Sequence, residues 1–141
     1  MSDRLNENWF VKPLALHRDD RGSLVAVEAG KDVPLAINRV YYLYGTAEGA
    51  ERGFHAHRTL EQLAVAVSGS CTFLLDDGAR QEEIRLDRPD AGLYVGAMVW
   101  REMRDFSPDC VVMVLASELY DERDYIRNRD DFLQHIGAGG R

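Results

Sequence analysis

Two histidines with one residue between them, His55 and His57, are the side chains in this sequence best suited to chemistry. They end the segment Gly53-Phe54-His55-Ala56-His57. If this segment is a β-strand, alternate side chains point to one face, so the two imidazoles lie together. Imidazole both binds metal ions and exchanges protons near neutral pH. The pair is therefore either half of a metal site or a pair for proton transfer.

The segments on both sides of this pair are short, rich in β-branched or aromatic residues, and separated by turn residues, as in sandwiches and barrels. Asp76-Asp77-Gly78 is a strong hairpin signal, because glycine accepts a positive φ. We expect an all-β fold with little helix before residue 118. The predicted strands are residues 23–28, 36–44, 54–57, 62–68, 71–75, 82–86, 92–95, 98–103 and 110–116.

The last part of the chain differs from the rest. Residues 120–135 are charged, with apolar residues spaced along them at Tyr125, Ile126, Phe132 and Leu133. This spacing predicts one or two short helices packed on the outside of the barrel, and residues 137–141 are expected to fray. The whole chain, residues 1–141, is predicted to be one domain, with a barrel core over about 20–118 and a helical tail over 119–136.

Composition argues against several classes of partner and site. The net charge is −7 and no basic run is present, so binding to nucleic acid is not expected. No apolar run approaches the roughly 20 residues that span a bilayer, and the first eight residues lack a secretory pattern, so we expect a cytoplasmic protein. Cys71 and Cys110 are the only cysteines and are predicted to be buried free thiols. Without a Cys-x-x-Cys pair, a structural zinc site is not expected.

The short strands and the histidine pair resemble the cupin double-stranded β-helix, a jelly-roll barrel. In the cupin pattern the histidines are followed by a glutamate and then a glycine. Here Gly69 supplies the glycine, but Gln62 occupies the glutamate position, and Arg101 stands where metal-binding cupins have a further histidine. Divalent ions prefer neutral imidazoles and carboxylates, and a guanidinium repels them. We therefore expect no bound metal and no other cofactor.

Arginines in or beside the predicted strands are candidates for binding an anionic small molecule. Arg39 and Tyr41 share one face of their strand, and Tyr42 lies on the other. A guanidinium is costly inside an apolar core, so the Arg39 face is expected to open onto a cavity. This favours Tyr41 over Tyr42 as a pocket residue. The candidate arginines are Arg21, Arg39, Arg52 and Arg101.

A series of motifs in order along the chain makes the resemblance more specific. From about Arg21 to Arg127, the sequence is similar to the sugar-nucleotide 3,4-ketoisomerases, which are metal-independent, WxcM-like cupins of deoxysugar biosynthesis. General cupins lack the Asp-Tyr-Ile-Arg segment at residues 124–127. The other matching segments are Arg21-Gly22-Ser23-Leu24, Arg39-Val40-Tyr41-Tyr42, residues 52–57, Asp76-Asp77-Gly78, Gly92-Leu93-Tyr94, residues 99–103, Leu115-Ala116-Ser117 and Tyr120-Asp121-Glu122.

This resemblance implies a reaction, partners and an assembly. The reaction converts dTDP-4-keto-6-deoxyglucose into a dTDP-3-keto-6-deoxyhexose through an enediol or enediolate. The assembly is a homodimer, often with exchanged N-terminal strands. The 3-keto product would pass to an aminotransferase that installs an amino group. Thymidine as the nucleoside rests on this analogy alone.

The resemblance also implies roles for individual residues. His55 is expected to be the main acid and base at carbon, and His57 to assist or orient it. Tyr41 would move protons between the two sugar oxygens or polarise them. Arg39 and Arg101 would stabilise the enolate or hold the diphosphate. The sequence offers no evident carboxylate base. The other expected substrate-binding residues are Arg21, Arg52 and Gln62.

Three other functions stay open at this point. A dTDP-4-keto-sugar epimerase of the same superfamily typically uses a lysine-assisted arrangement, and the only lysines, Lys12 and Lys31, lie outside the predicted pocket strands. A metal-dependent dioxygenase or isomerase needs ligands that Gln62 and Arg101 replace. A non-catalytic cupin that only binds sugar nucleotides is disfavoured by the intact histidine pair.

Overall fold

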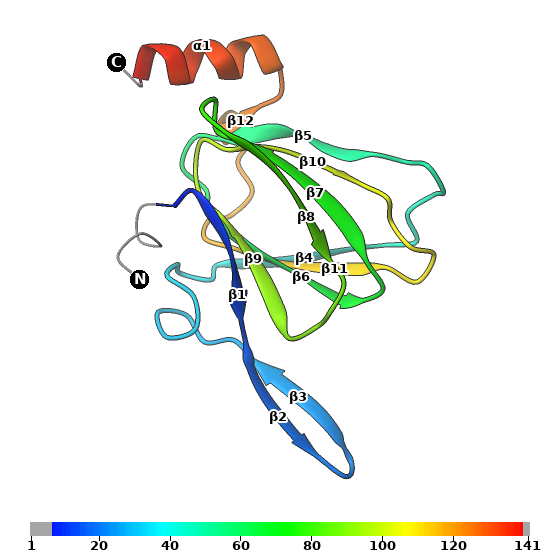
Figure 1. Ribbon diagram of the computed structural model, residues 1–141. Coiled ribbons are helices and arrows are strands. Elements are labelled where there is room, and N and C mark those ends of the chain that lie inside the picture. The colour runs from blue at the N-terminus through cyan, green and yellow to red at the C-terminus, as the bar shows by residue number, and fades with distance from the viewer. Residues whose placement is uncertain (1–6, 140–141) are drawn as a thin grey trace.

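The computed structural model describes residues 7–139 and is built mainly from antiparallel strands (Figure 1). This confirms the predicted all-β class with a short C-terminal helix. The elements are β1 (Trp9–Pro13), β2 (Ala15–Asp19), β3 (Gly22–Ala26), β4 (Arg39–Tyr44), β5 (Arg52–His57), β6 (Gln62–Ser68), β7 (Cys71–Asp76), β8 (Gln81–Leu86), β9 (Ala91–Val95), β10 (Trp100–Arg104), β11 (Val111–Ala116), the 3₁₀ helix η2 (Glu122–Asp124), β12 (Tyr125–Ile126) and α1 (Arg129–Gly139).

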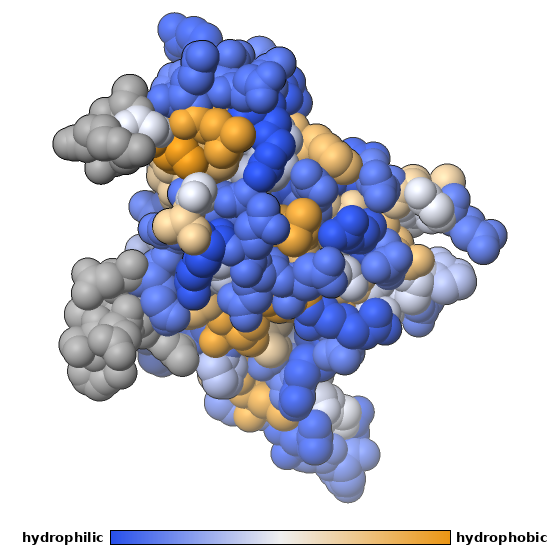
Figure 2. All heavy atoms as spheres, turned by 45° about the horizontal axis from the view of Figure 1, so that its top comes forward, coloured by the Kyte–Doolittle hydropathy of each residue, from blue (hydrophilic) through white to orange (hydrophobic). Residues whose placement is uncertain are grey.

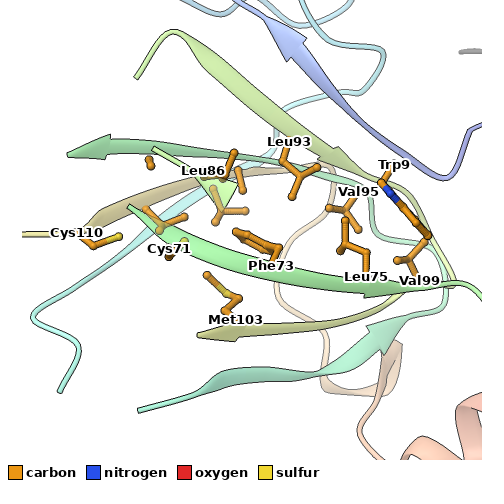
Figure 3. Packing of buried hydrophobic residues seen from close by; sticks show 14 residues of the cluster. Trp9, Cys71, Phe73, Leu75, Leu86, Leu93, Val95, Val99, Met103 and Cys110 are labelled. Carbon is orange, nitrogen blue, oxygen red and sulfur yellow. The ribbon is translucent and has the colours of Figure 1, made fainter. Parts of the chain in front are cut away.

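Two five-stranded sheets face each other and enclose the core. Their strand orders are β1-β9-β6-β11-β4 and β12-β5-β10-β7-β8, while β2 and β3 form a separate hairpin that projects from the body (Figure 1). Side chains from both sheets, such as Leu93 on β9 and Phe73 on β7, point towards one another in the space between them (Figure 3).

The N-terminal strands were not predicted. β1 pairs with β9, and it carries the Trp9 side chain, which is 1% exposed and whose Nε1 donates to Glu82 Oε1 at 2.7 Å. The barrel thus begins at Trp9 rather than near residue 20. Pro13 and the polar Lys12 hide the strand pattern of β1. Along β2 nearly every residue is exposed, so no alternation marks it.

The predicted strands are close to the observed ones. β6 spans the predicted residues, and β7, β9 and β11 differ from prediction by one residue at one end. The predicted strand over 36–44 is wrong at its start, since β4 begins at Arg39. Before it, the chain is held by the hydrogen bond from Asn38 N to the carbonyl oxygen of Ala116, at 2.9 Å.

The tail contains less helix than predicted. After η2, residues 125–126 add the short strand β12 to the edge of β5, and the single helix α1 begins only at Arg129. Phe132 on α1 is fully buried against Trp100, with ring centroids 5.8 Å apart. The expected fraying from residue 137 is wrong for residues 137–139, which lie in α1, and residues 140–141 fall outside the described part.

Two other sequence predictions concern the thiols and membranes. Cys71 and Cys110 are free and buried, as predicted, and burial raises the pKa of Cys71 to about 12. Within residues 7–139, no helix combines the length and the apolar character needed to cross a membrane.

Candidate active site

A cavity of about 300 Å³ opens between the two sheets, beside the histidine pair. Strands from both sheets line it, β4, β6 and β11 from one and β5, β7, β10 and β12 from the other. Cationic and phenolic groups gather here with one imidazole. The lining residues are Arg39, Tyr41, Leu43, Arg52, Gly53, His55, Gln62, Phe73, Arg101, Met103, Val114, Tyr125 and Arg127.

The cavity brings together most of the predicted site residues. Those in its lining are Tyr41, Arg39, Arg52, His55, Gln62 and Arg101. His57 does not line the cavity and lies next to His55, with only 1% of its surface exposed. Arg21 is elsewhere, on the turn of the β2–β3 hairpin, where its side chain is 87% exposed and pairs with Asp19 at 2.8 Å. Within one protomer, Arg21 therefore does not take part in this cavity.

Alternation along β4 decides which of its residues enter the cavity. Arg39, Tyr41 and Leu43 face inward and line it, while Tyr42 is 62% exposed on the opposite face. The Arg39 guanidinium stacks over the Tyr41 ring, with its carbon 5.2 Å from the ring centroid. The Nε of Arg39 is buried and has no partner in residues 7–139. A ligand acceptor at this point would satisfy it.

A buried guanidinium, an amide and a phenol form a continuous chain of hydrogen bonds in the cavity. Arg101 Nη1 donates to Gln62 Oε1 at 2.5 Å, and Gln62 Nε2 donates to the Tyr41 hydroxyl at 3.2 Å. Arg101 Nη2 donates to the carbonyl oxygen of Val99 at 2.9 Å. The amide oxygen that replaces the expected carboxylate is thus occupied by a cation. Gln62 fixes Arg101 and aims its own N–H groups at Tyr41.

Arg101 is a positive charge held almost without water. Its side chain is 3% exposed, and burial lowers its pKa to about 10, so it stays protonated at neutral pH. Its two hydrogen bonds in the described part of the chain go to an amide and a carbonyl oxygen, and neither of these carries a charge. An uncompensated buried charge favours an anion beside it. The cavity is therefore built to stabilise negative charge on a bound molecule.

The two imidazoles lie edge to face, with centroids 4.9 Å apart. This agrees with their predicted placement on one strand face. Burial, together with the charge of Arg101, lowers the pKa of His55 to about 4, although a hydrogen bond with the carbonyl of Gly53 opposes the shift. Burial and Arg101 also lower the pKa of His57. Both rings are therefore neutral at pH 7, and His55 is ready to accept a proton from a molecule in the cavity.

The sequence analysis missed a carboxylate that holds His57. Asp124 is buried, and its Oδ2 accepts a hydrogen bond from His57 Nδ1 at 2.9 Å. Its other oxygen accepts from the backbone N–H of Thr59, also at 2.9 Å. Burial raises the pKa of Asp124, but the hydrogen bonds with Thr59 and His57 outweigh this and lower it, which keeps the carboxylate ionised. Asp124 belongs to the Asp-Tyr-Ile-Arg segment, which was noticed as a motif without a role in the site.

The same segment supplies two further lining residues that were not predicted. Tyr125 lies against both imidazoles, with centroids 5.0 Å from His55 and 4.4 Å from His57. The Arg127 guanidinium stacks over Tyr125 at 4.2 Å from the ring centroid. β12 pairs with β5, with Tyr125 opposite His57. This pairing places Tyr125 in the site, together with Arg127, which directly follows the strand. Residues 125–127 thus form a wall of the site, while α1 packs on the outside of the barrel as predicted.

The lowered pKa of His55 predicts an unusual pH profile. We expect kcat/KM for a ligand turned over here to stay level down to about pH 5 and to fall about tenfold per pH unit below pH 4, because the neutral ring is the active form. Initial rates from pH 3.5 to pH 8 measure this. An acid limb near the ordinary histidine value of 6.5 would show that His55 is solvated.

Protein stability must be followed in the same pH series. An unfolded histidine takes up a proton near pH 6.5, whereas folded His55 does so only near pH 4. The unfolded state therefore binds more protons as the pH falls between these values, and stability is lost in this direction. Circular dichroism at each pH separates the loss of folded protein from the protonation of His55.

Comparison with known proteins places this arrangement in a family. The chain matches a family model described as FdtA, WxcM-like, C-terminal, over residues 7–137. A curated relative from Aneurinibacillus thermoaerophilus, named TDP-4-oxo-6-deoxy-alpha-D-glucose-3,4-oxoisomerase, is 58% identical over 118 residues, covering 84% of this chain and 85% of the relative.

Solved structures agree with this match in fold and in sequence. A 3,4-ketoisomerase from Helicobacter canadensis is 42% identical, with a TM-score of 0.89 over 92% of this chain and 98% of the other. A histidine-to-asparagine variant of QdtA, a 3,4-ketoisomerase from Thermoanaerobacterium thermosaccharolyticum, was solved with TDP-4-keto-6-deoxyglucose. It is 38% identical, with a TM-score of 0.90 over 93% of this chain and 95% of that chain. The chain therefore belongs to the FdtA, WxcM-like family of sugar-nucleotide 3,4-ketoisomerases.

Proposed function

We propose that this protein converts TDP-4-keto-6-deoxyglucose into a TDP-3-keto-6-deoxyhexose in the cavity described above. The observation that carries the proposal is a neutral imidazole, His55, in one cavity with the buried cation Arg101. The first is a base and the second stabilises an enolate, and together they suit proton abstraction next to a carbonyl. The activity named for the 58% identical relative supports the choice of substrate.

The reaction moves two protons and leaves the composition of the sugar unchanged. A base removes the proton from C3, the electron pair forms the C3–C4 double bond, and the C4 oxygen becomes an enolate oxygen. The C4 oxygen gains a proton, and the C3 hydroxyl loses one. Return of a proton to C4 then leaves a hydroxyl at C4 and a carbonyl at C3. One acid–base group at carbon and one relay between the two oxygens are sufficient.

The lining residues supply both parts. His55 takes the proton from C3 and returns one to C4, and His57 holds the His55 ring from its edge. Tyr41 serves the oxygens, because its hydroxyl is already in the hydrogen-bond chain with Gln62. Arg101 stabilises the enolate, since its charge is desolvated and no carboxylate in residues 7–139 hydrogen-bonds to it.

Three other arginines of the cavity are suited to the diphosphate. Arg39, Arg52 and Arg127 line the cavity on β4, β5 and the segment after β12. Guanidinium groups bind phosphate oxygens with two parallel hydrogen bonds. The unpartnered Nε of Arg39 provides one such donor. We propose that these residues hold the nucleotide while Arg101 stays with the sugar.

Incubation with TDP-4-keto-6-deoxyglucose in heavy water tests the proposed function. A ketoisomerase moves the carbonyl to C3 and places solvent deuterium at C4, which NMR of the product detects. An epimerase keeps the carbonyl at C4, and a binding module changes nothing; either result would refute the proposal. The epimerases of this superfamily are expected to use a lysine in the site. Lys12 and Lys31 line a separate cavity beside Tyr94, which favours the ketoisomerase outcome.

We also propose that the reaction needs no metal ion. The support is chemical: Gln62 Oε1 is already hydrogen-bonded to Arg101, and a fixed guanidinium opposes a divalent cation. Full activity is therefore expected after exhaustive chelation and gel filtration into metal-free buffer. Loss of activity that zinc, iron or manganese restores would contradict this. Metal content measured on the same sample shows whether chelation was complete.

A homodimer with exchanged N-terminal strands is part of the proposal. A cavity of about 570 Å³ lies between the β2–β3 hairpin and the outer face of β6 and β11, lined by apolar residues such as Leu16, Val25 and Val65. β4 is the edge strand of the same sheet. Its exposed residues Val40, Tyr42 and Tyr44 continue the apolar outer face. The surface is mostly hydrophilic, and apolar patches interrupt it, including one at the projecting hairpin (Figure 2). Burial of such a face stabilises a dimer.

In this dimer, Arg21 would act on the partner's cavity. The hairpin holds Arg21 away from its own site, with the side chain 87% exposed, which leaves it free to reach a second protomer. Arg21→Ala alone is expected to raise KM at least about tenfold. Mixed refolding of Arg21→Ala with His55→Asn protomers should restore about a quarter of wild-type activity, because half of the dimers then contain one complete site.

Both results of the mixing experiment are informative. Restored activity supports transfer of Arg21 between protomers. No restoration places Arg21 and His55 in one protomer's site and contradicts the exchange. Wild-type kinetics in Arg21→Ala would remove this residue from the substrate-binding set altogether.

The proposal extends to the surroundings of the reaction. The product carries a ketone at C3, which an aminotransferase can convert into an amine, so such an enzyme is expected to consume it. A nucleotide-linked sugar is an anion that does not cross membranes unaided, which supports a cytoplasmic place of action. A coupled assay with a sugar-nucleotide aminotransferase would detect the 3-amino product.

A further inference from the structure

β5 does not run as a regular strand through the site. Its pairing with β10 places His55 opposite Arg101 and Gly53 opposite Glu102, so the register shifts between Arg101 and Glu102. Two consecutive residues of β10 thus face residues of β5 that are two apart. Phe54 is the extra residue and has no partner across the ladder. This is a β-bulge, a feature that re-aims side chains and is common beside active sites.

The bulge changes which residues of β5 share a face. In a regular strand, Arg52 and His55 are three positions apart and point to opposite sides. Here both line the cavity. Phe54 does not line it, and the residue is 40% exposed. One inserted residue therefore brings a phosphate-binding candidate and the proposed base into the same cavity.

The backbone of the bulge has a conformation that few residues adopt. φ is 88° at Gly53 and 60° at Phe54, both in the left-handed region. A Cβ at Gly53 would lie 3.0 Å from the carbonyl oxygen of Arg101, so glycine also allows the strands to approach. Phenylalanine rarely takes a positive φ, whereas glycine and asparagine do so readily. Such strain persists where the surrounding structure imposes it.

The bulge also determines the protonation of the His55 ring. The carbonyl oxygen of Gly53 lies 3.1 Å from His55 Nδ1. A carbonyl oxygen only accepts, so Nδ1 carries the hydrogen and donates it. In the neutral ring, Nε2 then holds the free lone pair. Without the turned carbonyl of Gly53, this choice between the two nitrogens would be lost.

We propose that the Gly53–Phe54 bulge is a positioning device, which fixes the Nδ1–H tautomer of His55 and sets Arg52 beside it in the cavity. Phe54 contributes through its left-handed backbone and not through its ring. The inference rests on the proposed function, because it assigns His55 Nε2 as the atom that receives the proton from C3. Phe54 is a positioning residue and does not touch the substrate.

Substitutions at Phe54 separate the contribution of its backbone conformation from that of its aromatic ring. Phe54→Asn and Phe54→Gly remove the ring but accept a positive φ, so both are expected to keep kcat within about threefold of wild type. Phe54→Val keeps an apolar side chain but disfavours this backbone, and a misplaced base costs about 100-fold in kcat. Its affinity for TDP should also fall, as in Arg52→Ala, because Arg52 leaves the cavity.

The tautomer can be read directly. Long-range proton–nitrogen NMR of protein with isotope-labelled histidine should show hydrogen on Nδ1 of His55 in the wild type, in Phe54→Asn and in Phe54→Gly. In Phe54→Val this signature should disappear. A wild-type His55 with its hydrogen on Nε2 would overturn the proposal, even if Phe54→Val fails to fold and gives no kinetics.

The remaining outcomes also decide the question. Equal loss of activity in Phe54→Asn, Phe54→Gly and Phe54→Val would assign the role to the ring and refute the backbone argument. Wild-type kcat and TDP affinity in Phe54→Val would show that the bulge is not needed. If the wild type moves no carbonyl in heavy water, the proposed function fails, whereas the tautomer measurement still tests the bulge.

Discussion

Replacing His55 with asparagine is expected to lower kcat by at least about 10³-fold, which is within the range for loss of a general acid–base group. The amide is close to imidazole in shape, and its NH₂ group can still donate to the carbonyl oxygen of Gly53 in place of Nδ1. Its amide nitrogen is not basic, so it cannot take the proton from C3. The variant should therefore fold and bind TDP while losing the carbon chemistry.

Three measurements check the prediction for His55→Asn. Turnover gives kcat, calorimetry gives the affinity for TDP, and thermal unfolding reports the fold. His135→Asn is the matched control, because His135 is exposed on α1 and contacts Arg58 instead of the cavity. Near-normal turnover in His55→Asn would move the role of base to another group. Deuterium at C3 of the recovered substrate would show which variants still abstract that proton.

Replacing Asp124 with asparagine is expected to lower kcat by about 100-fold, by the same logic as the orienting aspartate of a catalytic triad. The carboxylate accepts from His57 on one oxygen and from Thr59 N–H on the other. The amide of asparagine has only one accepting oxygen. In either orientation, its NH₂ group therefore faces one of the two donors, His57 Nδ1–H or Thr59 N–H. His57 then loses its fixed tautomer or Thr59 loses its acceptor, and the ring behind His55 is no longer held.

Asp121→Asn is the control for this substitution. Asp121 starts the same 3₁₀ turn, is exposed, and pairs with Arg123 rather than with an imidazole. Its kcat and melting temperature should match the wild type. In Asp124→Asn the affinity for TDP should change little, because Asp124 does not line the cavity. A variant with wild-type kcat would show that the carboxylate serves only the fold.

Local patterns explain what could be predicted from the sequence. The side on which a residue lies is a property of its own strand, so alternation placed Arg39 and Tyr41 together and the two histidines side by side. Hairpin chemistry at Gly78, which has a φ of 94°, likewise marked the turn between β7 and β8. In both cases, nearby residues contain the whole signal.

Long-range contacts and local irregularities explain what could not be predicted from the sequence. Asp124 reaches His57 across 67 residues of sequence, and only the pairing of β12 with β5 brings it there. The bulge at Phe54 interrupts alternation where alternation was the main evidence, so the shared face of Arg52 and His55 has no local pattern. Arg21 was linked to the substrate by resemblance, but it lies outside the cavity of its own protomer.

The pairing of β12 with β5 has a consequence for synthesis of the protein on the ribosome. A nascent chain can pair β7 with β8 early, but β5 pairs only with β10 and β12, and His57 stays without its carboxylate partner until residue 124 has emerged from the exit tunnel. Non-local pairing of this kind is slow to form. The catalytic centre is therefore among the last parts of the molecule to mature, so enzymatic activity reports that translation has passed through the tail.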